Sequence, residues 1–84
     1  MKLLYFAWVR ERLGVAEEEV APPAAVTDVA SLLHWLAGRG AAYAAVLGER
    51  ERLCAAVNQV YARDPATPVG PDDEVALFPP VTGG

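Results

Sequence analysis

Residues 27–39, TDVASLLHWLAGR, form the best-defined element of the sequence. Thr27 suits the N-cap of a helix, Asp28 falls in the first turn where the helix dipole favours an anion, and Gly38 marks the end. Apolar residues then recur at i, i+3, i+4 and i+7, which places them in one stripe along a helix. The stretch therefore predicts an amphipathic helix that buries Val29, Leu32, Leu33 and Leu36.

Two side chains of this helix lie off the apolar stripe. At 100° per residue His34 lies opposite the stripe, so we expect it in solvent. Trp35 lies at the flank of the stripe, where it covers the core rather than binds a ligand.

Short apolar stretches on both sides of the helix predict strands. The first stretch is apolar on both faces and has no Gly or Pro, which is typical of a central strand. The second is weakened by three consecutive glutamates and ends at two prolines, which cannot donate to a ladder. The third and fourth flank a turn at Asn58-Gln59, and the last alternates in period two. The predicted strands are residues 2–7, 15–21, 53–57, 60–62 and 74–78.

Helical turns and one loop fill the remaining positions. Residues 8–13 precede Gly14, a residue free to take the positive φ of a helix C-terminus. Residues 41–47 predict a further helical turn, closed by Gly48. Residues 64–73 contain three prolines, a glycine and three aspartates, which indicates a loop.

The order of these elements predicts the fold class. One main amphipathic helix that packs on one face of a mixed sheet makes a two-layer α+β domain. The order strand, strand, helix, two short strands and final strand fits the β-grasp, or ubiquitin-like, fold, in which the first and last strands run parallel in the middle of the sheet. The 84 residues have room for one domain. We expect that domain over residues 1–78 and an extended tail over residues 79–84.

The tail has a composition suited to being handled by another protein. Pro79 and Pro80 fix φ near −65° and favour an extended chain that leaves the sheet. Six extended residues reach roughly 20 Å, enough to enter a deep site on a partner. Gly83 and Gly84 have no side chains, so a narrow channel can close around them. The alternative is an ordinary frayed terminus, because small residues are common there.

Composition excludes several classes of function. The net charge is −4, with one Lys and six scattered Arg, which argues against nucleic-acid binding. No apolar run approaches the roughly 20 residues of a transmembrane helix. The apolar N-terminus is interrupted at residues 10–12 and lacks a small-residue cleavage site, so it does not predict a signal peptide. We therefore expect a cytoplasmic protein that binds no membrane.

The chain has few of the side chains that usually form catalytic or metal-binding sites. One cysteine, Cys54, excludes an internal disulfide, and one histidine excludes a His-based zinc site or a Ser-His-Asp triad. No metal site is expected. Cys54 lies in an apolar stretch with only Arg52 as a nearby cation, so we expect a buried structural residue rather than a reactive thiol.

Three stretches resemble one known family. The run from Asp73 to Gly84, DEVALFPPVTGG, looks like the C-terminus of the molybdopterin synthase small-subunit (MoaD) family. Residues 55–59, AAVNQ, resemble its penultimate strand pair, and residues 6–11, FAWVRE, its first strand and helix. FPPVTGG at the very end is the most specific signal, whereas residues 16–52 add little.

The resemblance implies a sulfur carrier. An E1-like (MoeB-like) enzyme would use ATP to adenylate the Gly84 carboxylate, and a sulfur donor would then replace AMP to leave a thiocarboxylate. The large (MoaE-like) synthase subunit would bind the tail and pass the sulfur to cyclic pyranopterin monophosphate, which forms the dithiolene of molybdopterin. The family implies a heterotetramer of two small and two large subunits. Catalytic residues are expected in the large subunit, and no stably bound cofactor is expected here.

The resemblance also suggests a partner surface. It places Phe6 and Tyr61 against the large subunit, and the alternation of the last strand points Phe78 away from Val75 and Leu77. Aromatics near the root of the tail would form an exposed apolar patch, although Phe6 and Phe78 could instead pack in the core. Arg10 could bind a partner carboxylate or remain a solvated helix charge. The candidate partner-binding residues are Phe6, Arg10, Tyr61, Phe78, Pro79, Pro80, Val81 and Thr82, with Gly83 and Gly84 as the reacting end.

Two alternatives remain open from the sequence. Related carriers for thiamine synthesis or tRNA thiolation can share the Gly-Gly end. A ubiquitin-like protein modifier without a sulfur role is the other alternative.

Overall fold

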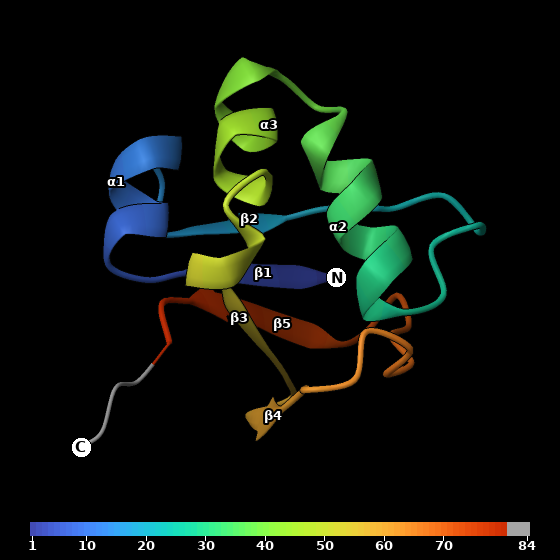
Figure 1. Cartoon of the computed structure of the whole chain (residues 1–84). Coiled ribbons are helices and arrows are strands. Elements are labelled where there is room, and N and C mark those ends of the chain that lie inside the picture. Colours follow the sequence, from blue (N-terminus) through green and yellow to red (C-terminus); the bar gives the residue numbers. More distant parts are fainter. Residues whose placement is uncertain (81–84) are drawn as a thin grey trace.

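The computed structural model describes residues 1–80, in which a five-stranded mixed sheet carries its helices on one face (Figure 1). Predicted residues Val81, Thr82, Gly83 and Gly84 lie outside the described residues. The elements are β1 (Lys2–Tyr5), α1 (Trp8–Leu13), β2 (Glu17–Glu19), α2 (Val29–Ala37), α3 (Ala41–Leu47), the 3₁₀ turn η1 (Arg50–Arg52), β3 (Cys54–Val57), β4 (Val60–Tyr61) and β5 (Glu74–Phe78).

The sheet has the predicted topology. Its strand order is β2-β1-β5-β3-β4, and β1 and β5 are parallel neighbours, with Tyr5 opposite Leu77. The other pairs are antiparallel, and β3 places Cys54 opposite Phe78. The first and last strands thus lie side by side inside the sheet, which confirms the β-grasp prediction.

Helix α2 begins one residue later than the sequence suggested. The predicted N-cap Thr27 is wrong, because Asp28 occupies that position. Asp28 Oδ1 accepts a hydrogen bond from the Ser31 amide at 2.8 Å, and Ser31 Oγ accepts one from the Asp28 amide at 3.1 Å. This reciprocal capping box satisfies two backbone donors, whereas a Thr27 cap would satisfy at most one. The hydrogen bonds from Ser31 also lower the pKa of Asp28.

The core lies between the sheet and three helices, of which α2 is the longest, as predicted. The predicted stripe of α2 is buried as expected, and Trp35 packs at its flank while His34 is exposed. The helical turns predicted at residues 8–13 and 41–47 are α1 and α3, which add Val9 and Val46, both fully buried. The fully buried or nearly buried side chains from the strands are Leu3, Tyr5, Ala55, Val75 and Leu77.

Backbone geometry explains where β1 and β3 end. Ala7 has φ of 52°, which breaks the extended chain, so β1 ends at Tyr5 rather than at the predicted Ala7, and α1 begins at Trp8 as predicted. Asn58 and Gln59 both have positive φ, the geometry of a tight type I′ hairpin turn. The Asn58 side chain accepts from the Glu74 amide and donates to Asp73, so the turn is tied to the start of β5.

Candidate functional site

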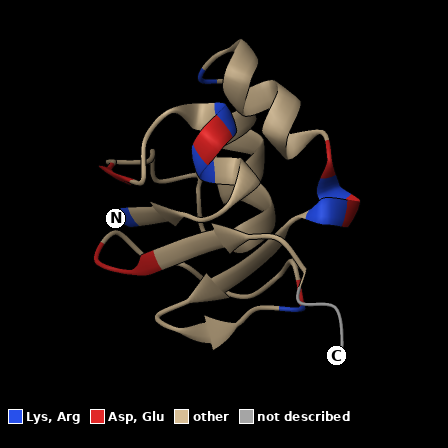
Figure 2. Ribbon diagram, turned by 90° about the vertical axis from the view of Figure 1, so that its left-hand side faces the viewer, with Lys and Arg blue, Asp and Glu red and all other residues tan. Residues whose placement is uncertain are grey.

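One face of the sheet is left without helices. Since successive side chains of a strand alternate, the residues opposite Leu3, Val75 and Leu77 point to this face. Strands β3, β4 and β5 are almost wholly uncharged in Figure 2, with Glu74 at the start of β5 the exception. We call the apolar part of this surface the open-face patch. It comprises Leu4, Phe6, Cys54, Ala56, Tyr61, Ala76 and Phe78.

The aromatic residues of the patch gather at the end of β5. Phe6 is 46% exposed and Tyr61 52% exposed. Phe78 is half-buried on the same face, and its ring meets that of Tyr61 edge-on with centroids 5.9 Å apart. The alternative that Phe6 and Phe78 pack in the core is therefore wrong. An apolar surface of this kind on a small protein usually marks a binding site for another protein.

The open-face patch adjoins the root of the tail. Phe78 is the last residue of β5, Pro79 is half-buried, and Pro80 is exposed. Arg10 is exposed on α1 and forms no ion pair with any residue of the described chain up to Pro80. Because α1 directly follows β1, which is parallel to β5, Arg10 lies at the same end of the sheet. A protein that holds the tail would thus meet these residues together.

Cys54 differs from its prediction as a buried residue. Its side chain is half-buried on the open face, and its Sγ lies 3.1 Å from the Tyr61 hydroxyl. This hydrogen bond is the main cause that raises the pKa of Tyr61. The reason is register: Cys54 is opposite Phe78 and so faces away from the helices. Cys54 thus contacts the Tyr61 hydroxyl, and the Tyr61 ring packs edge-on against the ring of Phe78.

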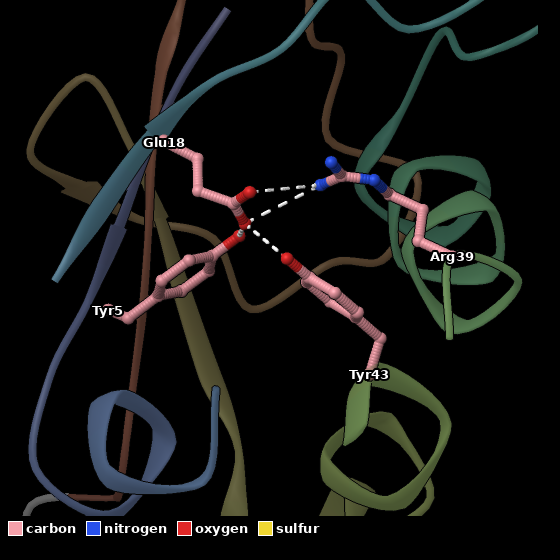
Figure 3. A network of polar contacts seen from close by, with 4 residues as sticks. All are labelled: Tyr5, Glu18, Arg39 and Tyr43. Carbon is pink, nitrogen blue, oxygen red and sulfur yellow. Dashed lines mark hydrogen bonds and ion pairs between the residues drawn. The ribbon is translucent and has the colours of Figure 1, made fainter. Parts of the chain in front are cut away.

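A network of polar contacts lies on the face of the sheet that the helices cover (Figure 3). The sequence analysis did not predict this network. The Glu18 carboxylate accepts hydrogen bonds from the hydroxyls of Tyr5 and Tyr43, both at 2.7 Å. Arg39 approaches the same carboxylate at 3.5 Å. The network therefore ties β1 and β2 to the end of α2 and to α3.

The ionisation of Glu18 stabilises the folded chain. Burial by itself opposes ionisation, but the hydrogen bonds from Tyr43, Tyr5 and Arg39 outweigh it and lower the pKa of Glu18. Burial and the same carboxylate raise the pKa of Tyr5, which stays a neutral donor. A lowered folded pKa gives stabilisation that is present above the unfolded value, near 4.5, and is lost as the pH falls through the folded value.

Replacement of Glu18 by Gln is expected to lower the free energy of unfolding by about 1–3 kcal/mol at neutral pH, because charged hydrogen bonds are lost. The deficit should begin to shrink as the pH falls below about 4.5, where the unfolded carboxylate takes up a proton, and should be lost as the pH falls through the lower pKa of the folded carboxylate. Urea unfolding of both proteins across this pH range measures it. Glu11→Gln, on the exposed surface of α1, removes the same charge and should have little effect. An equal loss in both variants would mean that net charge, not the network, is responsible.

Residues 1–80 contain neither a metal-binding cluster nor a membrane-spanning helix. Within residues 1–80 no group of three His, Cys, Asp or Glu side chains is arranged to hold a metal ion. No helix in that range is long and apolar enough to cross a lipid bilayer.

Comparison with known proteins agrees with this geometry. The model of the ThiS family matches residues 3–84. The chain is 43% identical over 84 residues to the molybdopterin synthase sulfur carrier subunit of Escherichia coli, covering all of this chain and 99% of that protein. It is 37% identical to the protein of the same name from Haemophilus influenzae over 89 residues, with coverage of 100% and 99%.

Solved structures show the same fold. SAMP1 of Haloferax volcanii, named small archaeal modifier protein 1, superimposes with a TM-score of 0.74 at 28% identity, covering 100% of this chain and 98% of that one. A Pyrococcus furiosus protein described as a candidate molybdopterin converting factor, subunit 1, gives a TM-score of 0.77 at 28% identity, with 95% of each chain covered. Given the match over nearly its whole length, the chain belongs to the ThiS family, and it is similar over its full length to molybdopterin synthase sulfur carrier subunits.

Proposed function

We propose that this chain is the sulfur carrier subunit of a molybdopterin synthase and that Gly84 carries the sulfur. The observation that supports this most is the 43% identity to the Escherichia coli subunit of that name over the whole chain. The fold adds a physical reason, because β5 delivers the tail directly beside an exposed aromatic surface.

The chemistry requires only an arm and a terminal carboxylate from this chain. A carboxylate is a poor electrophile, so an activating enzyme must first convert the Gly84 carboxylate to an acyl adenylate with ATP, releasing pyrophosphate. Attack by hydrosulfide, or by a donor persulfide whose S–S bond a thiol then reduces, expels AMP and leaves a thiocarboxylate, a soft anionic nucleophile. The thiocarboxylate donates its sulfur to cyclic pyranopterin monophosphate in the active site of the large subunit. The ATP and the substrate are bound by those partners, and we propose no stably held cofactor for this chain.

The open-face patch is the surface that we assign to the large subunit. Phe6, Tyr61 and Phe78 supply rigid aromatic contacts of the kind that dominate binding energy in interfaces. We also assign Arg10 and the tail residues 79–82 to contacts with the large subunit. We propose two carriers and two large subunits per assembly, an E1-like adenylyltransferase as second partner, and a cytoplasmic location for all three.

Genetic complementation separates this function from related ones. Expression of the chain in a strain without its own small subunit should restore molybdoenzyme activity, and a variant without Gly84 should not. If the chain restores thiamine synthesis or tRNA thiolation instead, the carrier role stands but the pathway is wrong.

A second candidate, a protein modifier, is favoured by the likeness to SAMP1, whose name describes such a role. Conjugates of the chain through Gly84 to lysines of other proteins would then accumulate. Immunoblotting of cells that express a tagged chain distinguishes the two, since a sulfur carrier alone leaves only the free species.

A further inference from the structure

A groove opens beside the open-face patch, on the edge of the domain. It lies between α2 and the strands β3 and β4 and has a volume of about 340 Å³. Its walls come from both layers of the fold, and the surface that they leave exposed is polar and apolar in about equal parts. The apolar lining residues are Val29, Leu33, Leu53, Ala55, Ala62 and Pro65.

Two arginines, Arg50 and Arg63, line the same groove, and both are exposed. Neither forms an ion pair with any residue from 1 to 80. The Arg63 guanidinium lies 5.4 Å from the centre of the Tyr61 ring, which keeps it near the groove. The adjacent carboxylate of Asp64 accepts a hydrogen bond from the Ala66 amide instead. The groove therefore presents free positive charge above an apolar floor.

The strand beside the groove has an unpaired edge. The Ala62 amide donates to the Ala55 carbonyl at 2.9 Å, so the neighbouring N–H and C=O of Tyr61 point away from β3. In the described residues β4 is the last strand of the sheet, with no strand on its outer side. Such an edge can accept an extended peptide, with main-chain hydrogen bonds giving affinity and side-chain pockets giving specificity.

We propose that this groove binds an extended segment of the large subunit in which an apolar side chain lies next to carboxylates. The apolar side chain fills the groove, and the carboxylates pair with Arg50 and Arg63. Continuity of surface argues for this occupant, because Cys54 and Tyr61 belong both to the open-face patch and to the groove. A partner that covers the patch thus reaches the groove without a gap. The inference rests on the proposed function, which supplies the large subunit as partner.

The test is binding of the cognate large subunit to the full chain, measured by calorimetry at several salt concentrations. Replacement of both Arg50 and Arg63 by Ala should weaken binding about tenfold or more and reduce its salt dependence. Val15→Asp combined with Ala16→Asp makes the same change in net charge at exposed positions just before β2, the strand at the opposite edge of the sheet from β4, and should leave affinity within about twofold. Equal affinity of the double variant and the native chain would overturn the proposal.

Hydrogen exchange gives a second and independent reading. In the native complex the amides of residues 60–63 should become protected, and in the double variant this protection should fall while that around Phe78 remains. Unchanged exchange at residues 60–63 in the native complex would contradict binding at the groove but would leave the proposed carrier function intact. Absence of any binding by the native chain would contradict the proposed function itself, and the groove assignment with it.

Discussion

Addition of one alanine after Gly84 is expected to abolish formation of the thiocarboxylate, while the unfolding midpoint of the domain stays the same. In the proposed function the activated group is the terminal carboxylate of a residue without a side chain, so that the adenylating enzyme can surround the chain closely. An added Ala moves the carboxylate by one residue, about 3.5 Å, and adds a Cβ at the reacting position. Incubation with the activating enzyme, ATP and a sulfur donor, followed by intact-mass measurement, shows the product directly.

The matched control for this variant places the alanine elsewhere in the sequence. The same residue inserted after Ala21, which is exposed in the loop between β2 and α2, lengthens the chain equally without touching the tail. It should leave thiocarboxylate formation intact. Efficient formation on the C-terminally extended chain would show that the terminal glycine is not the reacting position.

Replacement of Phe6 by Asp is expected to weaken binding of the large subunit by about 100-fold or more, because an unpaired charge would be buried in an apolar interface. The fold should survive, since the Phe6 side chain is 46% exposed and its structural contact is a main-chain hydrogen bond to Leu77. Calorimetry with the isolated large subunit measures the affinity, and circular dichroism checks the fold.

Val15→Asp is the control for the charge itself. Val15 is 40% exposed and lies outside the open-face patch. The Val15→Asp variant should bind the large subunit with the affinity of the native chain. If Phe6→Asp also bound normally, the open face would not be the interface and the partner would have to approach from another side.

Local sequence patterns were sufficient for most of the fold. The stripe of α2, the turn at Asn58-Gln59 and the alternation of β5 were confirmed because each depends on residues close together in the chain. The N-cap was misplaced because Thr27 and Asp28 are both good caps, and only the position of Ser31 three residues after Asp28 decides between them. That capping box was present in the sequence as a usable signal.

Long-range contacts were the part that the sequence did not predict. Three consecutive glutamates weakened the case for β2, yet Glu18 is the centre of a network with Tyr5, Arg39 and Tyr43, which are distant in the chain. Nothing local distinguishes Glu18 from Glu17 or Glu19 except strand parity. The groove is likewise formed by residues of α2, η1, β3 and β4. Its free arginines become significant only when the topology brings them together.

The sequence named the aromatic residues of the candidate site, but it did not predict every neighbour of those residues. Phe6, Tyr61 and Phe78 lie together on the open face, as the alternation of β5 and the family resemblance suggested. Cys54 was misassigned because an apolar stretch does not reveal which face of a strand each residue occupies. The roles of Val81, Thr82, Gly83 and Gly84 remain predictions from the sequence and from its similarity to known proteins.

The central claim, that Gly84 carries sulfur, is tested most directly by the intact mass of the native chain isolated from cells that contain its activating enzyme and a sulfur source. The proposed function predicts a species heavier by the exchange of one oxygen for one sulfur, located to Gly84 by fragmentation and absent when Gly84 is deleted. A chain whose mass stays at the unmodified value under these conditions would contradict the claim.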